Sequence, residues 1–250
     1  MLQGPSTRHG SARFLLVFTL IALLVTQPKA DHFIFGSGCF WGRQHDMVRL
    51  EQQKWARTPS EVTTVGGYFG GITSASEQQA CYYNQHDINV YSEEGHGEVL
   101  RLDIDISNLK EDSSNLKDAF QTYFSSFVRA SSTVYTREDY FDIGSGYRAL
   151  IGFQGGYHND TIMKILQQVD PHHTNFTEAK GDDADTLYNN QIWIYDTRNY
   201  TFHQAELCLQ FHNNQTGRYS AAYHDLKQSL VKDGKLIATN CPLPEIDSCL

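Results

Sequence analysis

One cysteine stands where a glycine-rich turn opens a helical stretch, in the segment Gly36-Ser37-Gly38-Cys39-Phe40-Trp41-Gly42. A thiol at that place faces unpaired backbone N–H groups and the positive end of the helix dipole, and both stabilise the thiolate. We therefore expect Cys39 to be a nucleophile, with Phe40 and Trp41 as apolar walls for a small soft group such as a methyl on sulfur. A buried structural cysteine at a helix start would show the same local pattern.

The chain holds five cysteines, an odd number, so at least one thiol is free or pairs outside the chain. Two of them, Cys241 and Cys249, lie in a tail that also carries two prolines. Because proline restricts the backbone and chain ends pack poorly, we expect residues 241–250 to form an extended, mobile tail.

The composition limits the classes of partner. The 250 residues include 29 acidic and 20 basic side chains, a formal net charge of −9. Nucleic acids and anionic lipids are bound through Lys and Arg, so this balance argues against both. A hydrophobic content of 40% with 12% aromatic residues is enough to bury a core, and we expect an ordered monomer.

The amino end has the pattern of a secretory signal. Two arginines precede the apolar run 14–25, and a polar stretch follows that ends at Ala30. The run is shorter than the roughly 20 residues that a spanning helix needs, so we expect residues 1–30 to be cleaved, leaving no membrane span. An uncleaved anchor is the alternative, since Pro28 is a poor residue before a cleavage point. The mature protein would be secreted or lie in the lumen of the secretory pathway.

Four triplets fit the acceptor pattern for N-linked glycans, and all lie in the carboxyl-terminal half. Each triplet alone is weak, but the set favours a glycosylated, exported protein. The four asparagines are Asn159, Asn175, Asn199 and Asn214.

Hydrophobic periodicity predicts the elements that position Cys39. Residues 97–106 alternate with the period of a half-buried strand, and residues 115–129 repeat apolar side chains at helical spacing. The resulting order, strand, helix, strand, strand, helix, strand, is the split βαβ arrangement, which predicts an α+β two-layer sandwich with a ferredoxin-like fold over residues 31–155. The segments are a strand at 32–35, a helix at 39–54, a strand at 62–68, the strand at 97–106, the helix at 115–129 and a strand at 147–153.

Further elements extend the domain to residue 240. Residues 161–169 have the apolar spacing of a helix, and residues 191–195 that of an additional strand. Residues 170–190 carry Asp, Asn, His and Thr without periodicity, so we expect a surface loop there.

The motif Gly38-Cys39-Phe40-Trp41-Gly42 resembles the signature of the type A peptide methionine sulfoxide reductases. Further matches follow in the order of that family, and the resemblance covers residues 31–153 and the terminal cysteine pair. These matches are Gly67-Tyr68-Phe69-Gly70-Gly71, Cys81, Gly95-His96-Gly97-Glu98-Val99 and Asp142-Ile143-Gly144-Ser145-Gly146-Tyr147-Arg148.

The resemblance implies a fold of the split βαβ type and reduction of the S epimer of methionine sulfoxide, free or in oxidised proteins. Cys39 would attack the sulfoxide sulfur and become a sulfenic acid. Glu98 would be the proton donor, which requires burial to keep the carboxyl group neutral. Tyr147 would donate a hydrogen bond to the sulfoxide oxygen, and Asp142 would shape the pocket. Without the resemblance, Glu98 would be read as a solvated glutamate.

The resemblance also implies how the enzyme is recycled. Cys241 and Cys249 would attack the sulfenic acid in turn, and an external thiol, thioredoxin-like or a small dithiol, would reduce the resulting disulfide. No metal and no bound cofactor is expected. The two tail cysteines could instead form a structural disulfide, as exported proteins often do.

The sequence departs from the family pattern near the expected site. Glu77 stands where a second pocket tyrosine is usual, and Tyr82 or Tyr83 could replace it. An insertion of about nine residues precedes Glu98, and Gln44 replaces an acidic residue. These departures leave a second hypothesis open, a catalytically inactive secreted binding protein on the same fold.

Overall fold

The computed structural model describes residue 1 and residues 31–71, 79–83, 87–88, 90–107, 109, 113–212 and 218–242. Four of the sequence predictions lie outside the described residues. These concern the signal peptide, the pocket position Glu77, the acceptor Asn214 and the tail cysteine Cys249.

The central sheet has the predicted split βαβ topology. Its four middle strands lie in the order β6 (Leu150–Phe153), β1 (Asp31–Gly36), β3 (Gly97–Ile104), β2 (Val65–Phe69), and all three pairings are antiparallel. Helix α1 (Phe40–Arg49) connects β1 to β2, and α3 (Ser114–Phe124) lies between β3 and β6. The predicted α+β two-layer sandwich is therefore confirmed.

Three strands extend this sheet. β8 (Gln191–Asp196) adds to β6 in parallel, β7 (Asn175–Glu178) adds to β8 in parallel, and β9 (His203–Gln204) pairs with the other edge at β2. The strand β7 corrects the prediction of a loop over residues 170–190. β7 is a half-exposed edge strand, so its sequence shows little of the alternation that marks strands with one buried face.

The helix predicted over residues 115–129 is shorter than expected. It ends at Phe124, and the chain continues into a hairpin of β4 (Phe127–Arg129) and β5 (Tyr135–Arg137). The helix predicted over residues 39–54 has the expected length, because a π-helix at Leu50–Lys54 continues α1.

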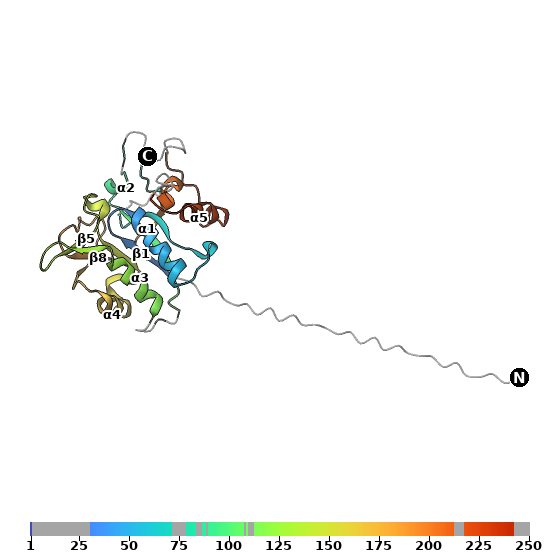
Figure 1. The fold of residues 1–250 in the computed structure, drawn as a ribbon, viewed down its shortest axis with the longest axis horizontal. Helices are drawn as coiled ribbons and strands as arrows, with labels where there is room; N and C mark the ends of the chain where they lie inside the picture. The colour runs from blue at the N-terminus through green and yellow to red at the C-terminus, as the bar shows by residue number, and fades with distance from the viewer. Residues whose placement is uncertain are drawn as a thin grey trace.

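Two layers of apolar side chains enclose the sheet. Helices α1, α3 and α4 (Asp160–Val169) cover one face, where Phe33, Phe35, Leu100, Leu102 and Ile104 form the main core with them (Figure 1). Strand residues of the opposite parity pack into a second cluster on the other face. Helix α5 (Ala221–Lys232) covers the side of α1 (Figure 1). In the part of the chain described, no helix combines the length and the hydrophobicity needed to cross a bilayer.

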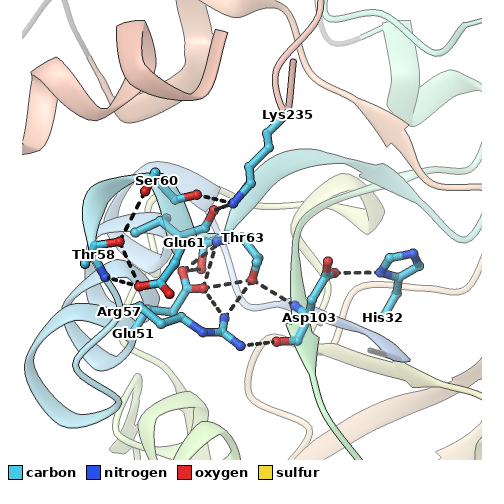
Figure 2. Close-up of polar contacts among 11 residues, drawn as sticks. His32, Glu51, Arg57, Thr58, Ser60, Glu61, Thr63, Asp103 and Lys235 are labelled. Atoms are coloured by element: carbon cyan, nitrogen blue, oxygen red, sulfur yellow. Dashed lines mark hydrogen bonds and ion pairs between the residues drawn. The ribbon is translucent and has the colours of Figure 1, made fainter. Parts of the chain in front are cut away.

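A buried carboxylate fixes the far end of α1 to the sheet (Figure 2). Glu51 in the π-helix is fully buried, and its carboxylate accepts hydrogen bonds from the Arg57 guanidinium and from the backbone N–H and hydroxyl of Thr63, both at 2.8 Å. Arg57 also donates to the backbone carbonyl of Asp103 on β3 at 2.8 Å. A buried charge is tolerated only when it is paired and hydrogen-bonded in this way. The cluster therefore fixes the position of α1 over β3.

Candidate active site

A tight turn carries the chain from β1 into α1 and places Cys39. Gly38 has a φ of +71°, and a Cβ at this position would lie 2.7 Å from the Cβ of Asp139, so only glycine fits. Cys39 is the N-cap residue of α1, and its backbone N–H donates to Oδ2 of Asp139 at 2.8 Å. The thiol therefore lies at the amino end of the helix, as the sequence predicts.

The alternation of β3 brings Glu98 to the same place. Glu98 shares the strand face of Leu100 and Leu102, which points at the helix layer, and only 3% of it is exposed. Its Oε2 accepts the backbone N–H of Phe40 at 2.9 Å. Burial raises the pKa of Glu98 to about 8, so at neutral pH the carboxyl group beside the Cys39 turn holds a proton.

The thiol itself differs from its expected state. Burial, and then the charge of Glu98, raise the pKa of Cys39 well above its usual range, while the backbone N–H of Trp41 opposes them. The prediction that the helix end keeps Cys39 as a thiolate is therefore wrong for the resting site, where the thiol is protonated. At neutral pH Cys39 and Glu98 therefore both carry their protons.

One tyrosine hydroxyl contacts Glu98, and the charge of Glu98 acts on two more. Tyr91, in the short helix α2 (Val90–Glu93), is fully buried and donates to Oε1 of Glu98 at 3.1 Å. Its hydroxyl also interacts with that of Tyr147. Burial, and next the Glu98 carboxylate, raise the pKa of Tyr82, Tyr91 and Tyr147, so each keeps its proton. The site offers several O–H donors to an oxygen atom.

A disulfide fastens the loop that carries Tyr82 and Tyr91. Cys81 is bonded to Cys241, and the N–H of Tyr91 donates to the carbonyl of Cys81 at 3.0 Å. A carboxylate oxygen of Glu206 lies within 4.8 Å of both sulfurs, a spacing that could suit a metal ion, but the two sulfurs are bonded to each other. The disulfide thus anchors the chain next to the two tyrosines.

Glu206 fixes the same loop through hydrogen bonds to its carboxylate. It is fully buried, and it accepts the N–H of Tyr82 at 2.8 Å and the hydroxyl of Tyr68 at 2.8 Å. The ring of Tyr68 stacks on that of Tyr91 with their centroids 4.5 Å apart. These contacts fix the rings of the loop against the sheet, because each polar group that they bury has a partner.

Phe40 and Trp41, the two residues expected to line the pocket, differ in their burial. The ring of Phe40 is 2% exposed and packs edge-on against Tyr68 in the core, so it does not present a free wall. Its contribution to the site is the backbone N–H that Glu98 accepts. Trp41 is half-buried and donates from Nε1 to the carbonyl of Leu209 at 2.9 Å.

Asp142 lies at the rim of the site beside Asp139. Burial, followed by the charge of Asp139, raises its pKa to about 6. Its charge acts on Cys39, Glu98 and Tyr147, which places it among the expected site residues. The carboxylates of Asp139 and Asp142 thus face the thiol from the segment after β5.

Cys241 does not lie free for Cys39. It is buried in its disulfide with Cys81, and Cys208 is also disulfide-bonded, so Cys39 is the free thiol among the described cysteines. This differs from the expectation of a mobile resolving thiol at Cys241. Attack of Cys241 on Cys39 would first require reduction of the Cys81–Cys241 bond.

Gln44 has a structural role. Its side chain donates to Oε1 of Gln210 at 2.9 Å and accepts the N–H of Phe211 at 2.7 Å. Gln210 in turn bonds both the N–H and the carbonyl of Gly66 in β2. The amide network joins α1, β2 and the segment after β9, and no acid is needed at this position.

Sequence reasoning missed two residues of the site. Tyr91 lies in the inserted segment, where no periodicity marks a contact, and Asp139 lies outside the matched motifs. The only signal for Tyr91 is a phenol seven residues before Glu98. Of the two tyrosines proposed to replace the missing one at Glu77, Tyr82 is the better candidate, because the charges of Glu98 and Cys39 both act on its hydroxyl.

Removal of the Tyr91 hydroxyl should destabilise the ionised form of Glu98 and so raise its pKa. The hydroxyl stabilises the carboxylate, so Tyr91→Phe is expected to move the titration of Glu98 to higher pH. The carboxyl infrared band of Glu98, followed against pH and assigned with Glu98→Gln, measures this shift. Tyr83→Phe, whose ring packs on Tyr82 away from that hydrogen bond, is the matched control. An unchanged titration in Tyr91→Phe would contradict the contact.

The fold and the site together define a class of protein: a split βαβ sandwich with a protonated thiol and a protonated carboxyl group, and with three phenols whose pKa the charge of that carboxyl group raises. No protein-family model and no curated protein matches this chain. The solved structures that are similar to it include the following two. Methionine sulfoxide reductase A of Corynebacterium diphtheriae is 15% identical, with 84% of this chain and 77% of that chain covered and a TM-score of 0.40. Mxr1 from Saccharomyces cerevisiae in reduced form is 18% identical, with 79% and 93% covered and a TM-score of 0.46.

Proposed function

We propose that this protein reduces the S epimer of methionine sulfoxide, free or within oxidised proteins, to methionine. The observation that carries the proposal is the pairing of Cys39 with a neutral acid. Glu98 is buried, has a pKa of about 8 and is hydrogen-bonded to the residue after Cys39. The resemblance of the motifs around both residues to the type A reductases supports the same reaction.

The first step balances without an outside proton. The sulfur of Cys39 attacks the sulfoxide sulfur, the S–H bond of Cys39 breaks, and the sulfoxide oxygen is protonated by Glu98. The oxygen then passes to Cys39, which becomes a sulfenic acid, and the thioether leaves as methionine. The thiol proton restores Glu98. A protonated resting thiol therefore suits this stoichiometry, because thiol and sulfoxide together give sulfenic acid and thioether.

The phenols and Asp142 act on the sulfoxide oxygen and its surroundings. Tyr147 donates a hydrogen bond to the oxygen as negative charge develops there, and Tyr82 and Tyr91 are two further donors in the same recess. Such donors, fixed before the substrate arrives, stabilise the transition state more than the ground state.

The enzyme returns to its starting state through thiols. One thiol condenses with the Cys39 sulfenic acid to a disulfide and releases water, and a second thiol releases Cys39. An external reductant, thioredoxin-like or a small dithiol, supplies both thiols while Cys81–Cys241 stays closed. Cys241 takes part only after reduction of the Cys81–Cys241 bond.

The reaction takes place after export in this proposal. The signal at residues 1–30 directs the domain of residues 31–240 to the secretory lumen or the outside, which suits the disulfides of Cys81, Cys208 and Cys241. Two predicted glycan acceptors, Asn175 and Asn199, are exposed. The protein would repair methionine in exported proteins.

The experiment offers both epimers of a methionine sulfoxide to the protein with dithiothreitol as reductant. The expected result is turnover of the S epimer alone. A lack of turnover of either epimer, or equal turnover of both, would overturn the proposal and favour the inactive binding protein. That alternative also predicts a permanent bridge at Cys39, whereas Cys39 is free among the described cysteines.

A further inference from the structure

In the loop of residues 139–144 the acidic side chains face the protein and the large apolar side chains are exposed, the reverse of the usual arrangement. Its acidic residues Asp139 and Asp142 point toward Cys39, whereas its apolar residues face solvent. Phe141 is 80% exposed, Ile143 70% and Tyr140 51%. Large apolar side chains gathered in one segment beside a recess are typical of a surface that another molecule covers.

The backbone that carries the exposed side chains is held in place. Arg137 donates to the carbonyl of Asp142 and pairs with Asp185 at 2.7 Å, and Asp185 accepts the N–H of Gly144 at 2.8 Å. The rings of Tyr140 and Phe141 pack together with their centroids 4.3 Å apart. A surface ordered in this way loses little conformational entropy when a partner binds.

The position of the loop limits what the partner can be. Its Asp139 is hydrogen-bonded to the backbone of Cys39, so a molecule that contacts Phe141 and Ile143 adjoins the reactive sulfur. Cys39 is recessed, and a long unbranched methionine sulfoxide side chain can reach it while the backbone that carries it stays on the rim.

On these grounds we infer that Tyr140, Phe141 and Ile143 form a docking surface for oxidised polypeptide with apolar residues beside the methionine sulfoxide. The inference rests on the proposed function and names its substrate class. Because consecutive residues of an extended chain lie about 3.3–3.6 Å apart, the contacts are expected within the first few residues on either side of the sulfoxide. Burial of one or two apolar side chains makes such peptides bind roughly tenfold more tightly than peptides with serine flanks.

The test measures binding and turnover separately. Fluorescence anisotropy with Cys39→Ser protein compares two labelled peptides, each with one methionine S-sulfoxide flanked by Leu or by Ser. The Leu-flanked peptide should bind about tenfold more tightly, and the further change of Phe141→Ser with Ile143→Ser should remove this difference. A protein with Phe141→Leu in place of the two serine changes should keep most of the difference in affinity between the two peptides. Ile237→Ser, a change at a residue that is 63% exposed in the segment after α5, is the matched control and should alter neither affinity.

Turnover with dithiothreitol completes the test in the protein that keeps Cys39. The double variant should lose about tenfold in kcat/KM on the Leu-flanked peptide and retain its rate on free methionine sulfoxide. Equal binding of both peptides would overturn the inference even if the sulfoxide is reduced, and a loss that appears only with thioredoxin as reductant would assign the surface to the reductant. Absence of turnover with discrimination in binding would overturn the proposed reaction alone.

Discussion

Cys39→Ser should abolish reduction of methionine sulfoxide, with a fall in kcat/KM of at least about a thousandfold. A serine hydroxyl does not accept the sulfoxide oxygen, because oxidation of sulfur to a sulfenic acid has no counterpart at a serine oxygen under these conditions. The measurement is production of methionine from the S epimer with dithiothreitol. In the protein with Cys39, sulfoxide added without reductant should yield one methionine per chain and leave Cys39 as the sulfenic acid.

A change of the disulfide is the control for this prediction. Cys81→Ser combined with Cys241→Ser should keep the yield of one methionine per chain, because neither sulfur is free to react in the structure, whereas the rate should fall because the loop of Tyr82 and Tyr91 loses its anchor. Mass spectrometry of trapped sulfenic acid locates the oxygen. Turnover that persists in Cys39→Ser, or oxygen found on another cysteine, would place the reaction elsewhere.

The sequence predicted the frame of the site because periodicity reports burial. The alternation of β3 predicted one face for Leu100, Leu102 and Ile104, and the structure places them there. Glu98 lies on the same face and is buried, which the family resemblance implied and the alternation alone did not. The turn before Cys39 marked the start of α1 through its glycines. The strand and the turn together place Cys39 and Glu98 at the amino end of α1.

The inserted loop could not be predicted in the same way. Tyr82 and Tyr91 reach the site through a loop whose position depends on the Cys81–Cys241 disulfide and on Glu206, residues far apart in the chain. Such long-range contacts leave no period in the sequence. The same reason explains Asp139, whose partner is the backbone of Cys39, 100 residues away.

The error about the thiolate has a quantitative cause. The field at a helix end stabilises a charge by about 0.3–1 kcal/mol, whereas removal of a charge from water costs several kcal/mol. The dipole was visible in the sequence and the burial was not. Around Cys39 burial dominates, and the neighbouring Glu98 carboxylate adds to it, so the pKa rises.

Glu98→Gln should lower kcat/KM by about a hundredfold to a thousandfold and change its dependence on pH. The active form of Glu98 is protonated, and its pKa is about 8, so activity of the unchanged protein should be high below pH 8 and fall as the pH rises through that value. The glutamine amide carbonyl can still accept the N–H of Phe40, so the fold of the turn is expected to survive. The measurement is the pH profile of kcat/KM for the S epimer, between about pH 5 and pH 10, with dithiothreitol in excess.

The shape of that profile separates Glu98 from its neighbours. The pKa of Asp142 is raised to about 6, so titration of Asp142 would make the activity fall near pH 6, whereas titration of Glu98 would make it fall near pH 8. Glu98→Asp keeps an ionisable acid on a shorter side chain, so it should retain a falling limb at a reduced rate, whereas Glu98→Gln should have none. A limb near pH 8 that persists in Glu98→Gln would assign the titration to a group other than Glu98 and contradict this prediction. In the proposed reaction Glu98 gives a proton to the departing oxygen and regains one from the Cys39 thiol. Loss of the acid alone should therefore reduce formation of the Cys39 sulfenic acid to a residual rate.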